Sequence, residues 1–340
     1  MHGKYRTLAL TALSAVVSCQ LALGQAAPAT ILDIELDNYV VYFNDVSDYS
    51  RLATDPNRTT VTQPRNFSHA IGIADIVSVN GKPAKGMFTE QRTQFNLRVN
   101  PSGGQAIADG ERNNRIERFY EILKPDGTQI GSIIATGNGG GTPPPGAPLA
   151  ASSDANHMIF GGTGAFLGAR GQQSSPPINA TLPEPRNASV TEDPANRRIN
   201  GGGQRHFILH VIPLSRPEVA ITATGPAVTH ASNFSLVTAA NPARPGEILA
   251  LFATGLGPTV PGVDPGKPFP ASPLARVNSP VEVTVNGAPA EVLDAVGYPG
   301  TTDTYQVNFR LPSGLTPGQA SLQVSTAWIA GYEVRISVQQ

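Results

Sequence analysis

Hydrophobic and polar residues alternate along several short segments in the first two thirds of the chain, and these segments are rich in β-branched and aromatic residues. They span residues 31–43, 70–79, 86–99, 115–123, 128–136 and 204–213. Asn80-Gly81 and Lys124-Pro125-Asp126-Gly127 are typical turn sequences between them. Consecutive strands joined by short turns predict an antiparallel up-and-down sheet. About seven or eight such strands are expected to close into a barrel, because closure removes exposed edges.

Two longer segments, 137–156 and 173–203, do not fit a compact meander of strands. Both are rich in Pro, Gly, Ser and Asn and contain few apolar residues that could join a core. Loops of this length are usually functional or disordered. We therefore expect these segments to be disordered or to form a loosely packed cover over the barrel.

A glycine-rich segment, FGGTGAFLGARGQ at residues 160–172, raises the question of a phosphate-binding loop, a hinge or a curved strand. A phosphate loop needs Lys-Ser or Lys-Thr after its glycines, and a dinucleotide-binding loop needs a following helix. The next residues, QQSSPP at 172–177, supply neither. The segment is predicted to be a strand whose glycines allow curvature and close backbone approach, with Phe166 and Leu167 on opposite sides.

Residues 162–172 resemble the late-strand signature of the allene oxide cyclase and dirigent β-barrel family, a Gly-Gly-Ser/Thr-Gly-x-Phe-x-x-Ala stretch followed by a last strand. The order of segments agrees, with an early aromatic strand at 39–44 and a last strand at 206–212. The resemblance implies a barrel over residues 30–215, although the two long insertions depart from the plant pattern. It also implies a possible cyclase (isomerase) or dirigent activity, which shapes a reactive substrate inside a hydrophobic cavity and needs few catalytic groups. Only the glycine segment aligns, so the family's catalytic residues do not transfer.

The last third of the chain shows strand patterns at residues 247–253, 281–285, 290–295, 305–311, 320–327 and 333–338. Their spacing is typical of an immunoglobulin-like β-sandwich, expected over 226–340 after a linker at 216–225. Residues 241–258, with 281–290, 305–312 and 315–318, resemble the C-terminal domain that recurs in secreted proteins of Solibacter-type acidobacteria. That resemblance supplies no catalytic residue. The predicted fold class is all-β, an antiparallel up-and-down barrel followed by an immunoglobulin-like sandwich.

The N-terminus has the features of an export signal. Lys4 and Arg6 precede an apolar run at 8–23, and small residues at 22–24 suit a signal peptidase, so residues 1–24 are predicted to be removed. Alternatively, residues 16–19 resemble a bacterial lipobox, which would leave a lipidated Cys19 as the N-terminus. Either route predicts a secreted, periplasmic or cell-surface protein with no transmembrane segment after signal removal, because the run is short for a membrane span.

Composition narrows the function further. Cys19 is the only cysteine, so a chain cut after residue 24 has no disulfide and no cysteine metal site. Without Lys4 and Arg6 the chain carries 22 basic residues against 25 acidic ones, a formal charge of −3 that indicates no nucleic-acid partner. The chain holds 35 Gly and 31 Pro, which disfavour long helices and favour short strands joined by turns.

No metal or cofactor site is predicted. His206 and His210 share a strand face but lie about 13 Å apart at roughly 3.3 Å per residue, too far to chelate one ion. A metal would need His157 or His69 as well, and the sequence does not place either of them. The Gly-x-Ser-x-Gly nucleophile motif is absent.

Charged residues on the predicted barrel strands are the remaining candidates for chemistry. They are Asp75, Glu90, Glu117, Glu121, Arg92, Arg98 and Arg118. Asp75 interrupts the apolar positions 71, 73, 77 and 79, so an inward Asp75 paired with Arg92 or Arg98 could act as an acid or base on a bound substrate. The alternative is a β-bulge that changes which residues of the strand face inward and leaves Asp75 in solvent. Arg170 is interpreted as a strand-end arginine that pairs with a surface acid.

Together these patterns favour an exported binding protein over an enzyme. The barrel would bind or present a small hydrophobic ligand or a cell-surface component, and the second domain would serve attachment or spacing. The alternatives are an enzyme of the cyclase or dirigent type and a purely structural barrel filled by its own side chains. An open interior lined by polar residues would support a ligand inside the barrel, and a filled interior would argue against one.

Overall fold

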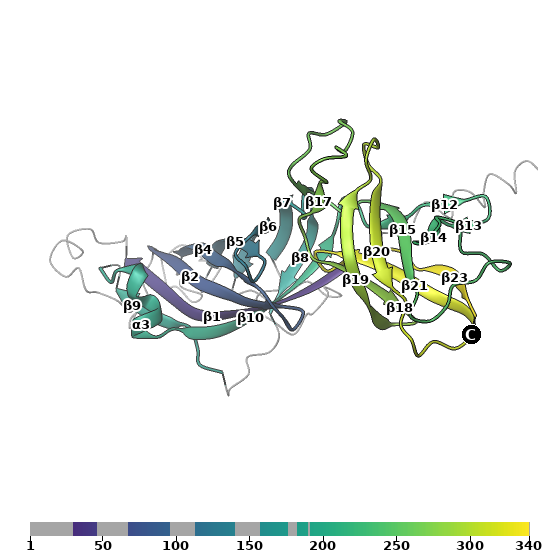
Figure 1. Ribbon diagram of the computed structural model, residues 1–340. Coiled ribbons are helices and arrows are strands. Elements are labelled where there is room, and N and C mark those ends of the chain that lie inside the picture. The colour runs from purple at the N-terminus through teal and green to yellow at the C-terminus, as the bar shows by residue number, and fades with distance from the viewer. Residues whose placement is uncertain are drawn as a thin grey trace, which may run out of the picture.

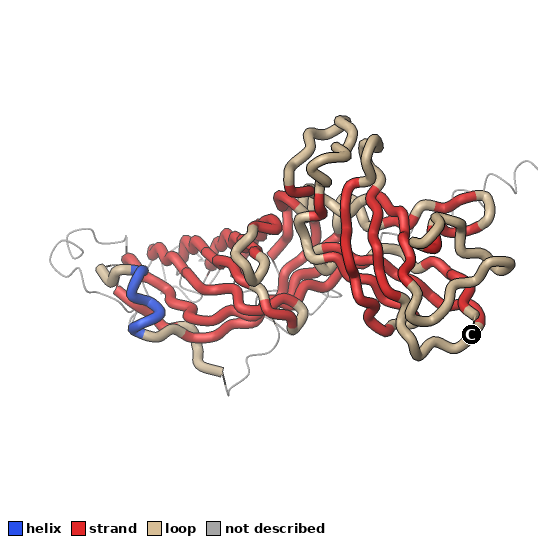
Figure 2. The backbone as a smooth tube through the Cα atoms, in the orientation of Figure 1, coloured by secondary structure: helices blue, strands red, loops and turns tan. Residues whose placement is uncertain are grey.

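A computed structural model describes residues 30–45, 67–95, 113–139, 157–175, 182–189 and 191–339. The predicted signal segment 1–24, Cys19, Arg98 and most of the first long loop lie outside these residues. Strands dominate the described chain (Figures 1 and 2). Within the described ranges, no helix is both long and apolar enough to cross a membrane.

The first domain is a closed antiparallel barrel of eight strands, as the alternation predicts. The eight strands are β1 (Thr30–Asp45), β2 (Phe67–Val79), β4 (Lys85–Phe95), β5 (Asn113–Leu123), β6 (Gln129–Gly139), β7 (His157–Gly164), β8 (Arg170–Ser174) and β10 (Gly203–Ile212). Each barrel strand pairs with the next one along the chain, and β1 pairs with both β2 and β10, which closes the barrel. A two-residue strand, β3 (Lys82–Pro83), extends the Asn80-Gly81 turn and pairs with β2.

Aromatic side chains fill the middle of the barrel. Tyr39, Phe88, Tyr120 and Phe207 are all at most 1% exposed. The ring of Phe88 lies 5.1–5.4 Å, centroid to centroid, from the other three rings. Edge and tilted contacts of this kind add about 0.5–1.5 kcal/mol per pair beyond the burial of area. At this level the described side chains of the barrel pack against one another.

Residues 160–172 are a hairpin rather than the single curved strand that the glycines predict. They form the end of β7, a turn at 165–168 and the start of β8. Gly164 and Gly168 have φ angles of 61° and 71°, which favour glycine and permit the tight reversal. Phe166 is buried and Leu167 is 65% exposed, so the prediction that they face opposite sides is confirmed.

The described part of the second long segment contains regular structure, which corrects the expectation of loose cover there. Its described part forms β9 (Arg186–Ser189), the 3-10 helix η2 (Pro194–Asn196) and the single-turn helix α3 (Arg197–Asn200). β9 pairs in parallel with β1 from Val40 to Phe43, beyond the point where β10 begins. Figure 1 shows β9 and α3 at the end of the barrel away from the second domain.

The second domain is also built from antiparallel strands around its own apolar core. Its main strands are β15 (Ile248–Thr254), β18 (Val281–Val285), β19 (Ala288–Gly297), β20 (Tyr305–Arg310), β21 (Gly318–Thr326), β22 (Ile329–Ala330) and β23 (Val334–Val338). Shorter strands are β11 (Glu218–Val219), β12 (Ile221–Thr222), β13 (Gly225–Pro226), β14 (Val228–His230), β16 (Thr259–Val260) and β17 (Arg276–Val277). The segment expected as a linker contains β11, which pairs with β15, so the chain enters this domain by residue 218.

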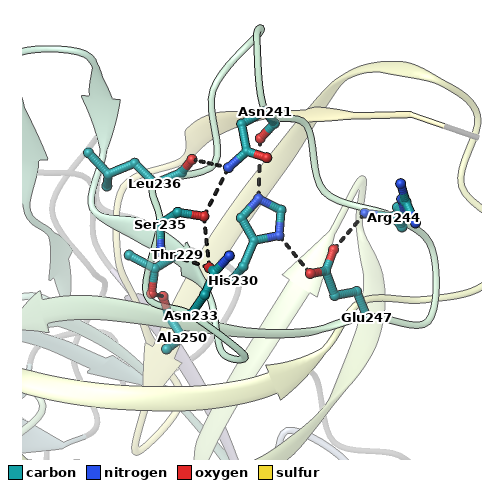
Figure 3. A network of polar contacts seen from close by, with 9 residues as sticks. All are labelled: Thr229, His230, Asn233, Ser235, Leu236, Asn241, Arg244, Glu247 and Ala250. Carbon is teal, nitrogen blue, oxygen red and sulfur yellow. Dashed lines mark hydrogen bonds and ion pairs between the residues drawn. The ribbon is translucent and has the colours of Figure 1, made fainter.

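A polar network spans the connection between β14 and β15 in the second domain (Figure 3). The Nδ1 atom of His230 lies 2.6 Å from Glu247 Oε1, and the other carboxylate oxygen accepts the backbone N–H of Arg244 at 2.9 Å. The side-chain amide of Asn241 donates to the carbonyl of Leu236 at 3.0 Å. Because each group bonds within the domain, the network holds the chain between β14 and β15 in place.

The turn between β21 and β22 closes one end of the barrel. Ala327 and Ile329 are 0% and 3% exposed and belong to the apolar core of the barrel, and Trp328 packs against the same core. Ala327 and Trp328 both have positive φ angles, 47° and 63°, as a tight two-residue hairpin turn requires. Asn278 Nδ2 adds a hydrogen bond to the carbonyl of Gln129 at 2.6 Å across the same junction. The two domains therefore share a core.

The two ends of the barrel differ. Turns at 80–81, 124–128 and 165–168, together with the exit of β10, lie at the end closed by the second domain. The strand ends joined by the four longer connections, at 46–66, 96–112, 140–156 and 176–202, lie together at the other end, as the strand registers require. The long connections of the barrel therefore all start and finish at the end remote from the second domain.

Candidate functional site

A charged cluster lies inside the barrel, toward the end away from the second domain. Glu90 on β4 is 2% exposed and contacts two guanidinium groups and one phenol. Arg118 on β5 donates from Nε to Glu90 Oε2 at 3.1 Å, while Arg92 and the hydroxyl of Tyr39 bond to Oε1. Arg92 also donates to the Tyr39 hydroxyl at 3.1 Å. We call these four residues the interior cluster; it ties β1, β4 and β5 together.

The electrostatics of the interior cluster do not suit proton transfer near neutral pH. Burial opposes ionisation of Glu90, but the guanidinium groups of Arg92 and Arg118 outweigh it and hold the pKa of Glu90 below its ordinary value. Burial and the neighbouring carboxylate raise the pKa of Tyr39 well above its ordinary value. An efficient general acid or base has a pKa near the working pH. The arrangement instead keeps Glu90 charged and Tyr39 neutral, as a structural network does.

Small residues of β2 make room for this cluster. Gly72 lies on the inner face, and a methyl group there would approach Glu90 Cγ to 2.6 Å and Tyr39 Cε2 to 2.9 Å. Ala70 and Ala74 occupy the neighbouring inward positions and are buried. Beside these small residues the large apolar side chains of β2 face outward, and Ile71 and Val77 are 49% and 41% exposed, whereas Ile76 and Val79 are buried in the barrel core.

Asp75 lies on the same face of β2 as Ile71 and Val77, the outer face of the barrel. The expectation that it faces into the barrel is therefore corrected. It does not stand free in solvent either, because it anchors the helix α3. Arg198 donates from Nε to Asp75 Oδ2 at 2.8 Å and from Nη2 to Oδ1 at 2.7 Å, and Arg197 pairs with Oδ1. Asn38 on β1 adds a bond to Oδ2 at 3.1 Å. Asp75 thus fastens the segment 191–202 to the outside of the barrel.

Replacing Asp75 with asparagine should lower stability at pH 7 and lose this effect in acid. Burial raises the pKa of Asp75, but the bonds from Arg198 and the charge of Arg197 outweigh it, so the folded-state pKa lies below the ordinary value. A carboxylate with a depressed pKa contributes stability above its unfolded-state pKa of about 3.9 and loses it as pH falls through the folded-state pKa. Urea unfolding at pH 7 and pH 3 measures the difference.

The control for this prediction is Asp264→Asn, which removes an exposed carboxylate from a distant loop of the second domain. The effect of this substitution on stability should show no comparable dependence on pH. A deficit for Asp75→Asn that is equally large at pH 3 would contradict the anchoring role of the ionised carboxylate.

A groove lies mainly on the outside of the barrel, across β1, β2 and β4, and its lining also includes the inward-facing Ala70 and Arg92. Its volume is about 580 Å³, within the range that small-molecule sites occupy. The lining residues are Tyr42, His69, Ala70, Ile71, Ile73, Gln91, Arg92, Thr93, Glu192 and Pro194. We call it the outer groove. Glu192 and Pro194 belong to the segment that Asp75 fastens, so this anchor positions one wall of the groove.

The wall of the outer groove that contains Glu192 is held by an ion pair. Arg186 on β9 donates to both carboxylate oxygens of Glu192, at 3.0 and 2.7 Å, and from Nε to the carbonyl of Gly201 at 2.7 Å. A bidentate pair of this kind fixes both direction and distance. The floor is apolar, because Tyr42, Val40 and Ala188 form a small buried cluster with Ile73 packed against it.

The other residues singled out from the sequence are dispersed. His206 pairs with Asp33 on β1, and Glu121 accepts a bond from the amide of Gln129 at 3.2 Å. Glu117 and Arg170 are exposed. Among the described residues no three His, Cys, Asp or Glu side chains gather as a metal site would require. Arg92 and Arg118 meet at Glu90, whereas Arg98 lies outside the described residues.

Sequence reasoning missed Tyr42 and Glu192 as groove residues. Tyr42 stands in the early aromatic strand, but its outward direction depends on a register shift in β1 between Asp37 and Val40. Glu192 lies in a segment without strand periodicity. No protein-family model and no curated protein matches this chain.

Proposed function

We propose that the protein is an exported binding protein that takes a small, largely apolar ligand in the outer groove. The observation that carries this proposal is the groove itself, a space of about 580 Å³ with an apolar floor and one ordered wall. Small-molecule sites typically combine apolar lining with a few placed polar groups. The exposed position of Ile71, a large apolar side chain on the outer face of a sheet, agrees with a surface that a ligand covers.

The second domain, in this proposal, holds the barrel and leaves the ligand site free. An immunoglobulin-like arrangement for attachment or spacing is part of the proposal. The support is positional: the second domain closes one end of the barrel, and the segment that forms the groove wall lies at the other end (Figure 1). A binding role is favoured over catalysis because the interior cluster holds the pKa of Glu90 below its ordinary value and that of Tyr39 above its ordinary value.

Blocking the groove should abolish binding while leaving the fold intact. The variant Ile71→Lys places a long charged side chain in the groove at a position that is already half exposed. The matched control is Val77→Lys, which lies on the same strand and the same outer face but does not line the groove. Each protein would be incubated with an organic extract of the producing cells and weighed by native mass spectrometry.

We expect a small-molecule adduct on the unaltered protein and on Val77→Lys, and its loss by at least tenfold on Ile71→Lys, because a charge is costly to bury against an apolar ligand. Absence of any adduct on the unaltered protein, or an equal adduct on Ile71→Lys, would overturn the proposed function.

A further inference from the structure

The charged groups that line the outer groove already have partners. Glu192 is held by both terminal nitrogens of Arg186, and Arg92 contacts Glu90 and the hydroxyl of Tyr39. The remaining cation of the interior cluster, Arg118, stacks over the ring of Phe207 at 4.5 Å inside the barrel. An ionic ligand would have to break one of these pairs, and breaking a buried or half-buried pair is costly. The groove therefore favours a ligand without net charge.

The hydroxyl of Tyr42 stands out among the uncharged polar groups of the groove. Tyr42 is 6% exposed and lines the groove, and its hydroxyl makes no hydrogen bond within the part of the chain that is described. Buried polar groups without partners are uncommon and costly. Burial, and after it the charge of Glu192, raises the pKa of Tyr42, so the hydroxyl keeps its proton at neutral pH and can donate.

We propose that the outer groove binds an uncharged, largely apolar molecule that presents one oxygen atom, of a hydroxyl, ether or carbonyl group, to the hydroxyl of Tyr42. This inference rests on the proposed function and specifies its ligand class. Ile71 and Ile73 contact the apolar body of the ligand. Tyr42 orients the molecule by its single polar atom, as specific small-molecule sites do with a few placed donors.

The test uses three naphthalene probes that differ in one substituent: naphthalene, 2-naphthol and the anion 2-naphthoate. Dissociation constants would be measured by ligand-observed NMR at pH 7 with the full-length chain. We expect 2-naphthol to bind about fivefold more tightly than naphthalene, which corresponds to one net hydrogen bond. We expect 2-naphthoate to bind more weakly than 2-naphthol, because Arg92, the arginine among the described lining residues, is already paired with Glu90.

The decisive variant is Tyr42→Phe, which removes only the hydroxyl. It should fold normally, because the lost group has no partner among the described residues, and it should bind 2-naphthol and naphthalene equally. Tyr298→Phe, at a half-exposed tyrosine of the second domain, is the control and should retain the preference. Thermal unfolding of each variant would confirm that folding is unchanged.

The outcomes separate the ligand class from the proposed function. Equal affinities for naphthalene and 2-naphthol in the unaltered protein, tighter binding of 2-naphthoate, or a preference that survives Tyr42→Phe would overturn the ligand class alone. Binding of none of the three probes, or binding that Ile71→Lys leaves unchanged, would overturn the groove as a ligand site.

Discussion

Replacing Glu90 with glutamine is expected to lower the free energy of unfolding by about 3–5 kcal/mol. The substitution preserves the size of the side chain but removes the carboxylate to which Arg92 and Arg118 both bond in the interior cluster. The guanidinium groups of Arg92 and Arg118 then remain in the barrel without the charge of Glu90. Since domains are stable by only about 5–15 kcal/mol, the loss should be evident as a large shift of the urea midpoint.

The matched control is Glu117→Gln, the same chemical change on the adjacent strand β5. Glu117 is exposed on the outer face and opposes Gln91 in the sheet register. A surface change of this kind should alter stability by no more than about 0.5 kcal/mol. If the two variants were equally stable, the interior cluster would have to be hydrated, and its assignment as a buried structural network would fail.

The second large effect is expected for Ile329→Ala, which should cost about 2–5 kcal/mol. Ile329 belongs to the second domain in sequence but is 3% exposed within the apolar core of the barrel. Its truncation leaves a cavity at the floor of the barrel, where the surrounding strands cannot easily collapse. The control is Ile221→Ala, a second-domain isoleucine that is 67% exposed and should be nearly neutral.

The single tryptophan of the chain gives this prediction a local reporter. Trp328 stands beside Ile329 and packs against the same core, so its fluorescence follows the junction of the two domains. We expect fluorescence and circular dichroism to show one coincident transition in urea, which Ile329→Ala moves as a whole. Two separate transitions, with only the fluorescence altered by the substitution, would show that the shared core does not couple the domains.

The barrel strands could be predicted from alternation because most of them have one buried and one exposed face. The turns at 80–81 and 124–127 were equally informative, since their residue types allow the tight reversals that the structure contains. The glycine segment was predicted correctly as part of an antiparallel barrel and not as a phosphate loop. Its hairpin was missed because glycines serve close backbone approach and sharp turns alike.

The direction of Asp75 could not be predicted because the stretch of β2 before it inverts the usual pattern. There the inner face carries Ala70, Gly72 and Ala74, and the outer face carries the larger Ile71 and Ile73. The reason lies on other strands: Glu90 and Tyr39 fill the space in front of Gly72, so only small residues fit. Hydrophobic periodicity identifies which residues share a face of a strand. It does not reveal which face is inside when neighbouring side chains have already filled the interior.

The apolar core that the two domains share also governs the order in which the protein can complete its fold. All eight barrel strands lie before residue 213, whereas the hairpin turn that seals their core lies at residues 327–329. During synthesis, the last barrel strand is made more than a hundred residues before the hairpin turn at residues 327–329. The first domain therefore remains an unfinished structure until residues 327–329 have been made, and its maturation depends on a segment of the second domain.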